Sequence, residues 1–91
     1  MPNDWEVSLD PLFIEDLLYW ANCDHKLLIR LVTIVQAVAK DPVKGIGKPE
    51  PLKHLGSGMW SRRLNQEHRV VYWVGDRKVK FLQAQYHYWE G

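Results

Sequence analysis

Charged and aromatic side chains are concentrated in residues 47–74, GKPEPLKHLGSGMWSRRLNQEHRVVYWV, which include five cations, two histidines and three aromatic residues. Glu50 stands between two prolines, and proline fixes its own φ and biases the preceding residue toward extended backbone. The carboxylate is therefore expected on a stiff loop beside a sheet that carries arginines. These are Arg62, Arg63 and Arg69. A carboxylate that faces arginines could act on a phosphodiester.

RNA can be cut without a metal, because its 2′-hydroxyl is a nucleophile attached next to the scissile phosphate. The reaction needs a base, cations for the charge of the transition state and an acid for the leaving 5′-oxygen. We expect Glu50 to be the base and Arg69 the main clamp, because a guanidinium fork matches two phosphate oxygens. Lys53 and Arg63 would assist. His87 is the expected acid, because the ordinary pKa of histidine lies nearest neutrality.

Most of these residues also have a purely structural explanation, which the sequence leaves open. Glu50 could be a solvated loop acid, and Arg69 could pair with Glu67 or with an acid of the helices. We interpret His54 as a substrate contact and His68 as a hydrogen-bonding residue of a turn or the core.

Some of the aromatic residues are expected to contact the substrate and others to lie in the core. Tyr88 could stack on a base or hydrogen-bond a phosphate, whereas Tyr86 could fill the core. Trp60, Tyr72 and Trp73 are expected in the core, because the strands of a small sheet need large apolar residues to bury.

A metal-dependent nuclease is disfavoured by the distribution of acids. The cation-rich half of the chain has four carboxylates without a paired ligand spacing, namely Glu50, Glu67, Asp76 and Glu90. The lone Cys23 excludes an internal disulfide and a zinc site made of cysteines, and we expect a buried or half-buried thiol. No metal or cofactor is expected.

Length and charge indicate one small domain, residues 1–91, with a single core. No run of about 18 apolar residues is present, and the N-terminus lacks a charged-then-apolar leader, which predicts a cytoplasmic protein without a membrane span. Residues 1–43 carry three cations against seven acids, and residues 44–91 carry nine against four. This split predicts a basic face that attracts phosphates, although it could be an accident of composition.

The expected elements form an α+β fold. A short strand at residues 4–8 precedes a helix from Pro11 to about Ala21, capped by Asp10, and a second helix from His25 to Lys40. The apolar stripe of the second helix is predicted to be Leu28, Leu31, Val32, Val35 and Val38 or Ala39.

Three antiparallel strands are expected after the helices. The first two, residues 60–64 and 68–74, are joined by a polar turn, and a hairpin at residues 74–77 leads to a last strand over residues 78–85. A phase slip in the last strand predicts a bulge or burial of both faces. Two helices would pack on one face of a curved, mainly antiparallel four-stranded sheet, and the cationic and aromatic residues would lie on the other.

Four sequence motifs, KPEPLKH, SGMWSRR, EHRVVY and YHY, resemble in sequence and order those of the YoeB/Txe branch of the RelE-like (RelE/ParE) toxins of type II toxin-antitoxin systems. The resemblance implies a fold similar to small microbial ribonucleases, binding at the ribosomal A site and cleavage of mRNA there. It also implies a YefM-like antitoxin as partner and a possible homodimer.

The resemblance assigns roles to particular residues. Glu50, Arg69, His87 and Tyr88 match the family's catalytic positions, and Lys53, His54 and Arg63 match positions that handle RNA or phosphate. The chain departs from the family at Gln85, where relatives often have arginine, in its extra C-terminal residues Trp89-Glu90-Gly91, and in its N-terminal extension, residues 1–4.

Three functions remain open. The chain could be a ribosome-dependent endoribonuclease, a non-catalytic RNA- or protein-binding module of the same fold, or a toxin relative with a target other than the ribosome. The joint presence of Glu50 and His87 favours the enzyme, since a binding module needs no such pair.

Overall fold

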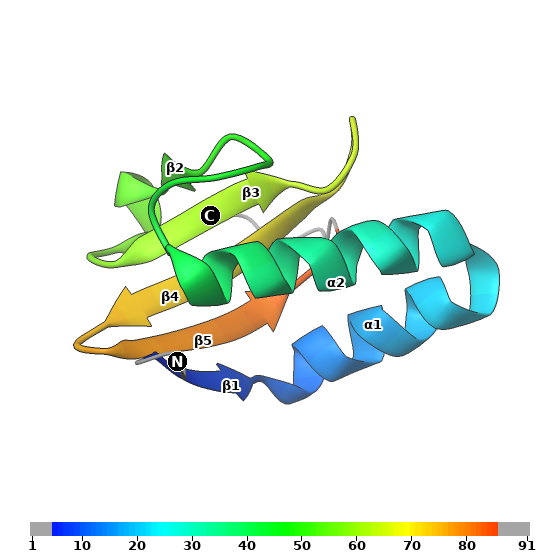
Figure 1. The fold of residues 1–91 in the computed structure, drawn as a ribbon, viewed down its shortest axis with the longest axis horizontal. Helices are drawn as coiled ribbons and strands as arrows, with labels where there is room; N and C mark the ends of the chain where they lie inside the picture. Colours follow the sequence, from blue (N-terminus) through cyan, green and yellow to red (C-terminus); the bar gives the residue numbers. More distant parts are fainter. Residues whose placement is uncertain (1–4, 86–91) are drawn as a thin grey trace.

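The computed structural model describes residues 5–85, which form two α-helices on one face of a five-stranded sheet (Figure 1). The elements in chain order are β1 (Glu6–Leu9), α1 (Pro11–Cys23), α2 (His25–Lys40), β2 (Glu50–Pro51), the 3₁₀ turn η1 (Lys53–Leu55), β3 (Met59–Arg63), β4 (Arg69–Gly75) and β5 (Lys78–Gln83). The α+β class predicted from the sequence is confirmed.

Local capping signals determine where the helices begin. The Asp10 carboxylate accepts a hydrogen bond from the Leu12 backbone N–H at 3.2 Å, and Asp24 does the same for Leu27 at 3.1 Å. Each cap satisfies a backbone donor that has no partner within its helix. The predicted range of the second helix, His25–Lys40, is confirmed, and α1 runs two residues beyond the predicted end at Ala21.

The sheet has the order β1-β5-β4-β3-β2. β1 pairs with β5 in parallel, and the other neighbouring pairs are antiparallel. The predicted number of four strands is wrong, because Glu50–Pro51 adds a fifth, two-residue strand at the β3 edge. Proline is compatible with an edge position, where its missing N–H does not interrupt a ladder on both sides.

The bulge expected in the last strand is confirmed. Val71 of β4 pairs with Gln83 while Tyr72 pairs with Phe81, so Leu82 is the extra residue. The bulge brings Ala84 back to the buried face that Phe81 occupies.

The core lies between the helices and the sheet. Its buried residues come from both helices, from β4 and β5 and from the residues that flank the strands: Phe13, Trp20, Leu31, Ile34, Val38, Leu64, Val70, Tyr72, Val79, Phe81 and Ala84. Two expectations are corrected here. Val32 is 43% exposed while Ile34 is buried, and Cys23 at the end of α1 is exposed instead of buried.

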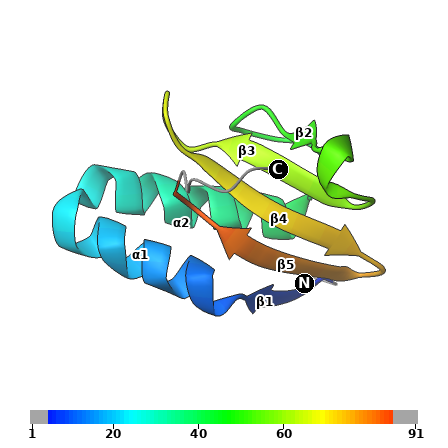
Figure 2. The same cartoon turned by 180° about the vertical axis from the view of Figure 1, so that it is seen from behind.

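Neither α-helix lies on the second face of the sheet (Figure 2). Because side chains alternate along a strand, Trp60, Arg62 and Leu64 point toward the helices while Ser61 and Arg63 point to the other side. The same alternation puts Arg69, Val71 and Trp73 of β4 on that second face.

Candidate active site

An ion pair between Glu50 and Arg69 lies on the second face of the sheet. Arg69 Nη2 is 2.8 Å from Glu50 Oε1, and Arg69 Nε donates a hydrogen bond to Ser61 Oγ at 3.0 Å. Glu50 pairs with Ser61 across β2 and β3, so the carboxylate and hydroxyl share one face. The predicted meeting of Glu50 and Arg69 is therefore observed, and the alternative pairing of Arg69 with Glu67 is wrong.

Ser61 is a site residue that the sequence analysis missed. Its side chain is fully buried, and it fixes one edge of a guanidinium whose side chain remains 35% exposed. A guanidinium held at Nε by Ser61 keeps its terminal nitrogens as donors, and Nη2 is the one that pairs with Glu50. No sequence signal points to it, because its role depends on the register that pairs Ser61 with Glu50.

Arg63 adds a second cation beside Arg69. The two residues are direct cross-strand partners, and the Arg63 side chain is exposed. Directly opposed side chains have Cβ atoms about 5 Å apart, and like charges at that separation repel. An anion bound between the two guanidinium groups would relieve the repulsion.

Arg62 does not face Glu50, which corrects the expectation that all three arginines lie beside the carboxylate. Its side chain is fully buried on the helix side, between the sheet and the segment that joins α2 to β2. Its guanidinium donates to three backbone carbonyls of that segment, those of Asp41 at 2.6 Å, Lys44 at 2.9 Å and Ile46 at 3.2 Å. Arg62 therefore organises the backbone that leads to Glu50.

This segment has an unusual backbone that needs such support. Gly45, Gly47 and Lys48 all have positive φ, and the Gly47 carbonyl accepts from the Arg63 N–H at 2.6 Å. A Cβ on Gly45 would lie 2.8 Å from the Arg62 guanidinium, so the glycine permits the close approach. A left-handed lysine directly before Pro49-Glu50 indicates a conformation that its surroundings impose.

Tyr72 completes the support of the segment from the sheet. Its hydroxyl donates to the Pro42 carbonyl at 2.6 Å and accepts from Arg62 Nε at 3.1 Å. Burial raises the pKa of Tyr72 above its ordinary value, while the hydrogen bond and charge of Arg62 act in the opposite direction. The hydroxyl therefore stays protonated at neutral pH and remains a donor.

We expect Arg62→Met to lower the free energy of unfolding by about 3 kcal/mol, because it leaves three carbonyls without their donor and each buried unsatisfied group costs about 1–3 kcal/mol. Urea denaturation followed by circular dichroism measures the change. Arg63→Met is the matched control at the exposed neighbouring position, where about 0.5 kcal/mol or less is expected. Equal effects of the two substitutions would contradict the role given to Arg62.

Lys53 and His54 lie on η1, which follows β2 almost directly, and both are exposed. Leu52 lies between the two elements, and its N–H donates a hydrogen bond to the Met59 carbonyl of β3 at 2.8 Å. The structure therefore puts both predicted phosphate-handling residues on the element next to Glu50, at the outer edge of the sheet.

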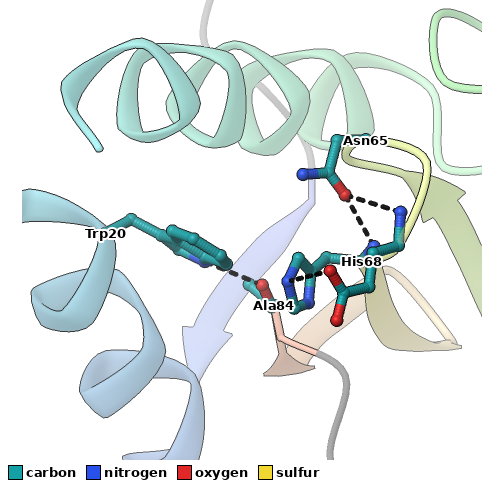
Figure 3. A network of polar contacts seen from close by, with 5 residues as sticks. Trp20, Asn65, His68 and Ala84 are labelled. Atoms are coloured by element: carbon teal, nitrogen blue, oxygen red, sulfur yellow. Dashed lines mark hydrogen bonds and ion pairs between the residues drawn. The ribbon is translucent and has the colours of Figure 1, made fainter. Parts of the chain in front are cut away.

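His87 and Tyr88 lie outside the described residues, and so does Tyr86. The described residues end at Gln85, and both the N–H and the carbonyl of Ala84 are hydrogen-bonded to side chains of α1. Asp16 Oδ2 accepts from the Ala84 N–H at 2.8 Å. The Trp20 indole donates to the Ala84 carbonyl at 2.9 Å (Figure 3). The sequence analysis missed Asp16, which is 2% exposed.

His68 lies on the helix side, where its ring meets the Trp20 indole edge-on at a centroid distance of 4.9 Å (Figure 3). Its backbone N–H donates to the side chain of Asn65 at 2.7 Å, and Glu67 lies 3.7 Å from its Nε2. The interpretation of His68 as a turn and core residue is confirmed.

The three strand aromatics do not share one environment. Tyr72 is fully buried, and Trp60 packs partly buried against the core, as expected. Trp73 is 36% exposed on the face of Glu50 and Arg69, so the expectation of a core role is wrong for it.

Two features are absent from residues 5–85, a membrane-spanning helix and a cluster of metal-binding side chains. No helix in this part of the chain is long and apolar enough to cross a membrane. In the same part, no three side chains of histidine, cysteine, aspartate or glutamate gather closely enough to hold a metal ion.

Residues 9–88 match the model of the family described as YoeB-like toxin of bacterial type II toxin-antitoxin system. The chain belongs to this YoeB family. Toxin RelK of Mycobacterium tuberculosis is 48% identical over 82 residues, which are 90% of this chain and 96% of the relative.

Solved YoeB structures have the same fold. The YoeB dimer from Staphylococcus aureus has a TM-score of 0.82 at 35% identity and covers 93% of this chain and 99% of its own. YoeB in a heterotetrameric YoeB-YefM complex from the same organism has a TM-score of 0.80 at 36% identity, with 92% and 98% covered. The predicted family is confirmed, and the protein is the toxin of a type II toxin-antitoxin system.

Proposed function

We propose that this YoeB-family toxin is a metal-independent endoribonuclease that cuts mRNA on the ribosome and thereby inhibits translation. The observation that carries the proposal is the Glu50 carboxylate at 2.8 Å from the Arg69 guanidinium on the cation-bearing second face of the sheet. A base and a phosphate clamp are two of the three groups that transesterification needs.

The reaction uses the ribose as its nucleophile. Glu50 takes the proton from the 2′-hydroxyl, the 2′-oxygen bonds to phosphorus and the bond from phosphorus to the 5′-oxygen breaks. Arg69 and Arg63 stabilise the charge that develops on the phosphate oxygens. The products are a 2′,3′-cyclic phosphate and a 5′-hydroxyl.

The ion pair between Glu50 and Arg69 can be exchanged for a contact between Arg69 and a substrate phosphate. Both partners are solvent-accessible, with side chains 35% and 63% exposed, so an arriving phosphate can compete for the guanidinium. Once the phosphate is bound, the carboxylate is released next to the ribose. Ser61 would keep the guanidinium in place during the exchange.

The third group is an acid for the leaving oxygen, and we assign it to His87. Tyr88 would contact the substrate next to it, and Lys53 and His54 would contact the RNA from η1. These assignments follow the family's motifs and the chemistry of the side chains.

The partners proposed for the chain follow its relatives. A YefM-like antitoxin would bind it, as the S. aureus complex contains YefM, and the toxin would form a homodimer as in the S. aureus YoeB dimer. Cleavage of mRNA at the ribosomal A site implies action in the cytoplasm by a single domain of residues 1–91.

The chemistry of the new RNA ends tests this proposal. Brief induction followed by primer extension locates the cuts, and we expect 5′-hydroxyl ends with 2′,3′-cyclic phosphate or 3′-phosphate on the other fragment. Ends with a 5′-phosphate would refute the mechanism. Binding of RNA without any cut, in purified translating ribosomes, would favour the non-catalytic binding module instead.

A further inference from the structure

Trp73 lies on the same sheet face as the Glu50 and Arg69 pair. It is two residues beyond Val71, whose cross-strand partner Ser61 pairs in turn with Glu50. Two residues along a strand correspond to about 7 Å. The large apolar side chain is 36% exposed there, although Val71 beside it is 7% exposed.

Two glycines provide the surface against which the indole lies. A Cβ on Gly75 would be 2.1 Å from Trp73 Cη2, and one on Gly58 would be 3.0 Å from Trp73 Nε1. The six-membered ring therefore occupies the space where residue 75 would carry a side chain. Any other residue at position 75 would displace the ring, so the two glycines hold the indole close against the backbone.

The indole therefore combines a fixed position with access to solvent. It leans along β4 toward Gly75, which lies about 13 Å along the strand from the row of Glu50. One RNA strand can span the distance between a phosphate bound at the Arg69 guanidinium, beside Glu50, and a base stacked on the indole. Lys80 is the cross-strand partner of Trp73 and the cation nearest the indole by register, while Arg63 and Arg69 lie farther along the sheet beside Glu50. These cations would hold the RNA backbone.

We propose that Trp73 is a stacking platform for a nucleobase of the RNA strand that Glu50 cuts, on a nucleotide flanking the scissile phosphate. This inference rests on RNA being the substrate, and it adds a base-binding site to the phosphate site. Base-aromatic stacking tolerates any base, because every base has a π-face. The platform would therefore position the strand without selecting a sequence.

A catalytically blocked full-length Glu50→Gln protein allows binding to be measured without cleavage. A short single-stranded RNA is added in steps to the ¹⁵N-labelled Glu50→Gln protein, and the indole N–H resonances are followed by NMR. The resonance of Trp73 is identified as the one that is lost when Trp73→Phe is added to this protein. We expect this resonance to shift with the normal RNA and not with an RNA of the same length that is abasic throughout. No shift of the resonance with normal RNA would overturn the stacking site.

Affinity measurements on the same background complete the test. Trp73→Ala is expected to weaken binding of the normal RNA by about tenfold or more and to leave the abasic RNA unaffected, whereas Trp73→Phe restores most of the affinity. Tyr19→Ala is the matched control, because this aromatic residue is 48% exposed on α1. Equal losses for both RNAs would overturn the proposal.

The two proposals fail separately. If the parent protein made no cut in mRNA on ribosomes while the Trp73 effects persisted, the nuclease function would be wrong and the base-binding site would stand. If the parent cut mRNA and Trp73→Ala bound both RNAs as the parent does, only the stacking platform would be refuted. Thermal unfolding of each variant confirms that the comparison is made between folded proteins.

Discussion

Glu50→Gln lowers the rate of mRNA cleavage by about 10²–10⁴ if Glu50 is the base, which is the usual contribution of one proton-transfer group. The amide keeps the size of the side chain and an oxygen that can accept from Arg69 Nη2, but it cannot take a proton from the ribose. The fold should persist, because an exposed ion pair contributes only about 0–1 kcal/mol to stability. A loss of activity with unchanged stability would therefore report on chemistry.

Cleavage is measured as the first-order rate on programmed ribosomes at saturating toxin, so that weakened binding does not contribute. Glu67→Gln is the matched control, because Glu67 is also an exposed carboxylate beside a basic side chain, 3.7 Å from His68 Nε2. We expect the control to cut as fast as the parent. A Glu50→Gln protein that retained the parent rate would remove Glu50 from the role of base.

The starts of both helices, the end of α2 and four of the five strands in the described part of the chain were predictable because local chemistry decides them. Asp10-Pro11 is an N-cap followed by a residue that needs no amide hydrogen, and Asp41-Pro42 is incompatible with continued helix. The bulge was visible as a break in the alternation of β5. These signals lie within a few residues of the feature that they predict.

The errors arise where a distant partner decides the outcome. Arg62 was expected beside Glu50, since charged residues are usually exposed, and only the folded chain shows the three carbonyls that make its burial possible. Trp73 was expected in the core because of its size, but its position in the alternation of β4 places it on the second face of the sheet, away from the helices. For Trp73, the position in the strand alternation predicts the side of the sheet better than the residue type does.

Of the proposed base and acid, Glu50 lies among the described residues and His87 does not. Proline-flanked Glu50 and Arg69 were predicted to meet, and the ion pair between them is observed. Ser61, which orients the clamp, gave no signal by itself, because a serine within a strand is common. Its role depends on the register that places β2 against β3.

His87→Gln is expected to lower the cleavage rate by about 10²–10⁴, because glutamine cannot protonate the leaving 5′-oxygen. Among the described residues, Asp16 and Trp20 hold the backbone of Ala84, three residues before His87 in the sequence.

The same measurement on His54→Gln decides which imidazole is the acid. Of the histidines in the described part of the chain, His68 contacts Trp20 on the helix side and His25 caps the end of α1 through the Ala21 carbonyl. His54 is exposed on η1 next to Glu50 and is the alternative that the geometry leaves. We expect His54→Gln to weaken substrate binding and to leave the rate at saturation within about tenfold of the parent. A larger loss at saturation for His54→Gln than for His87→Gln would transfer the role of acid to His54.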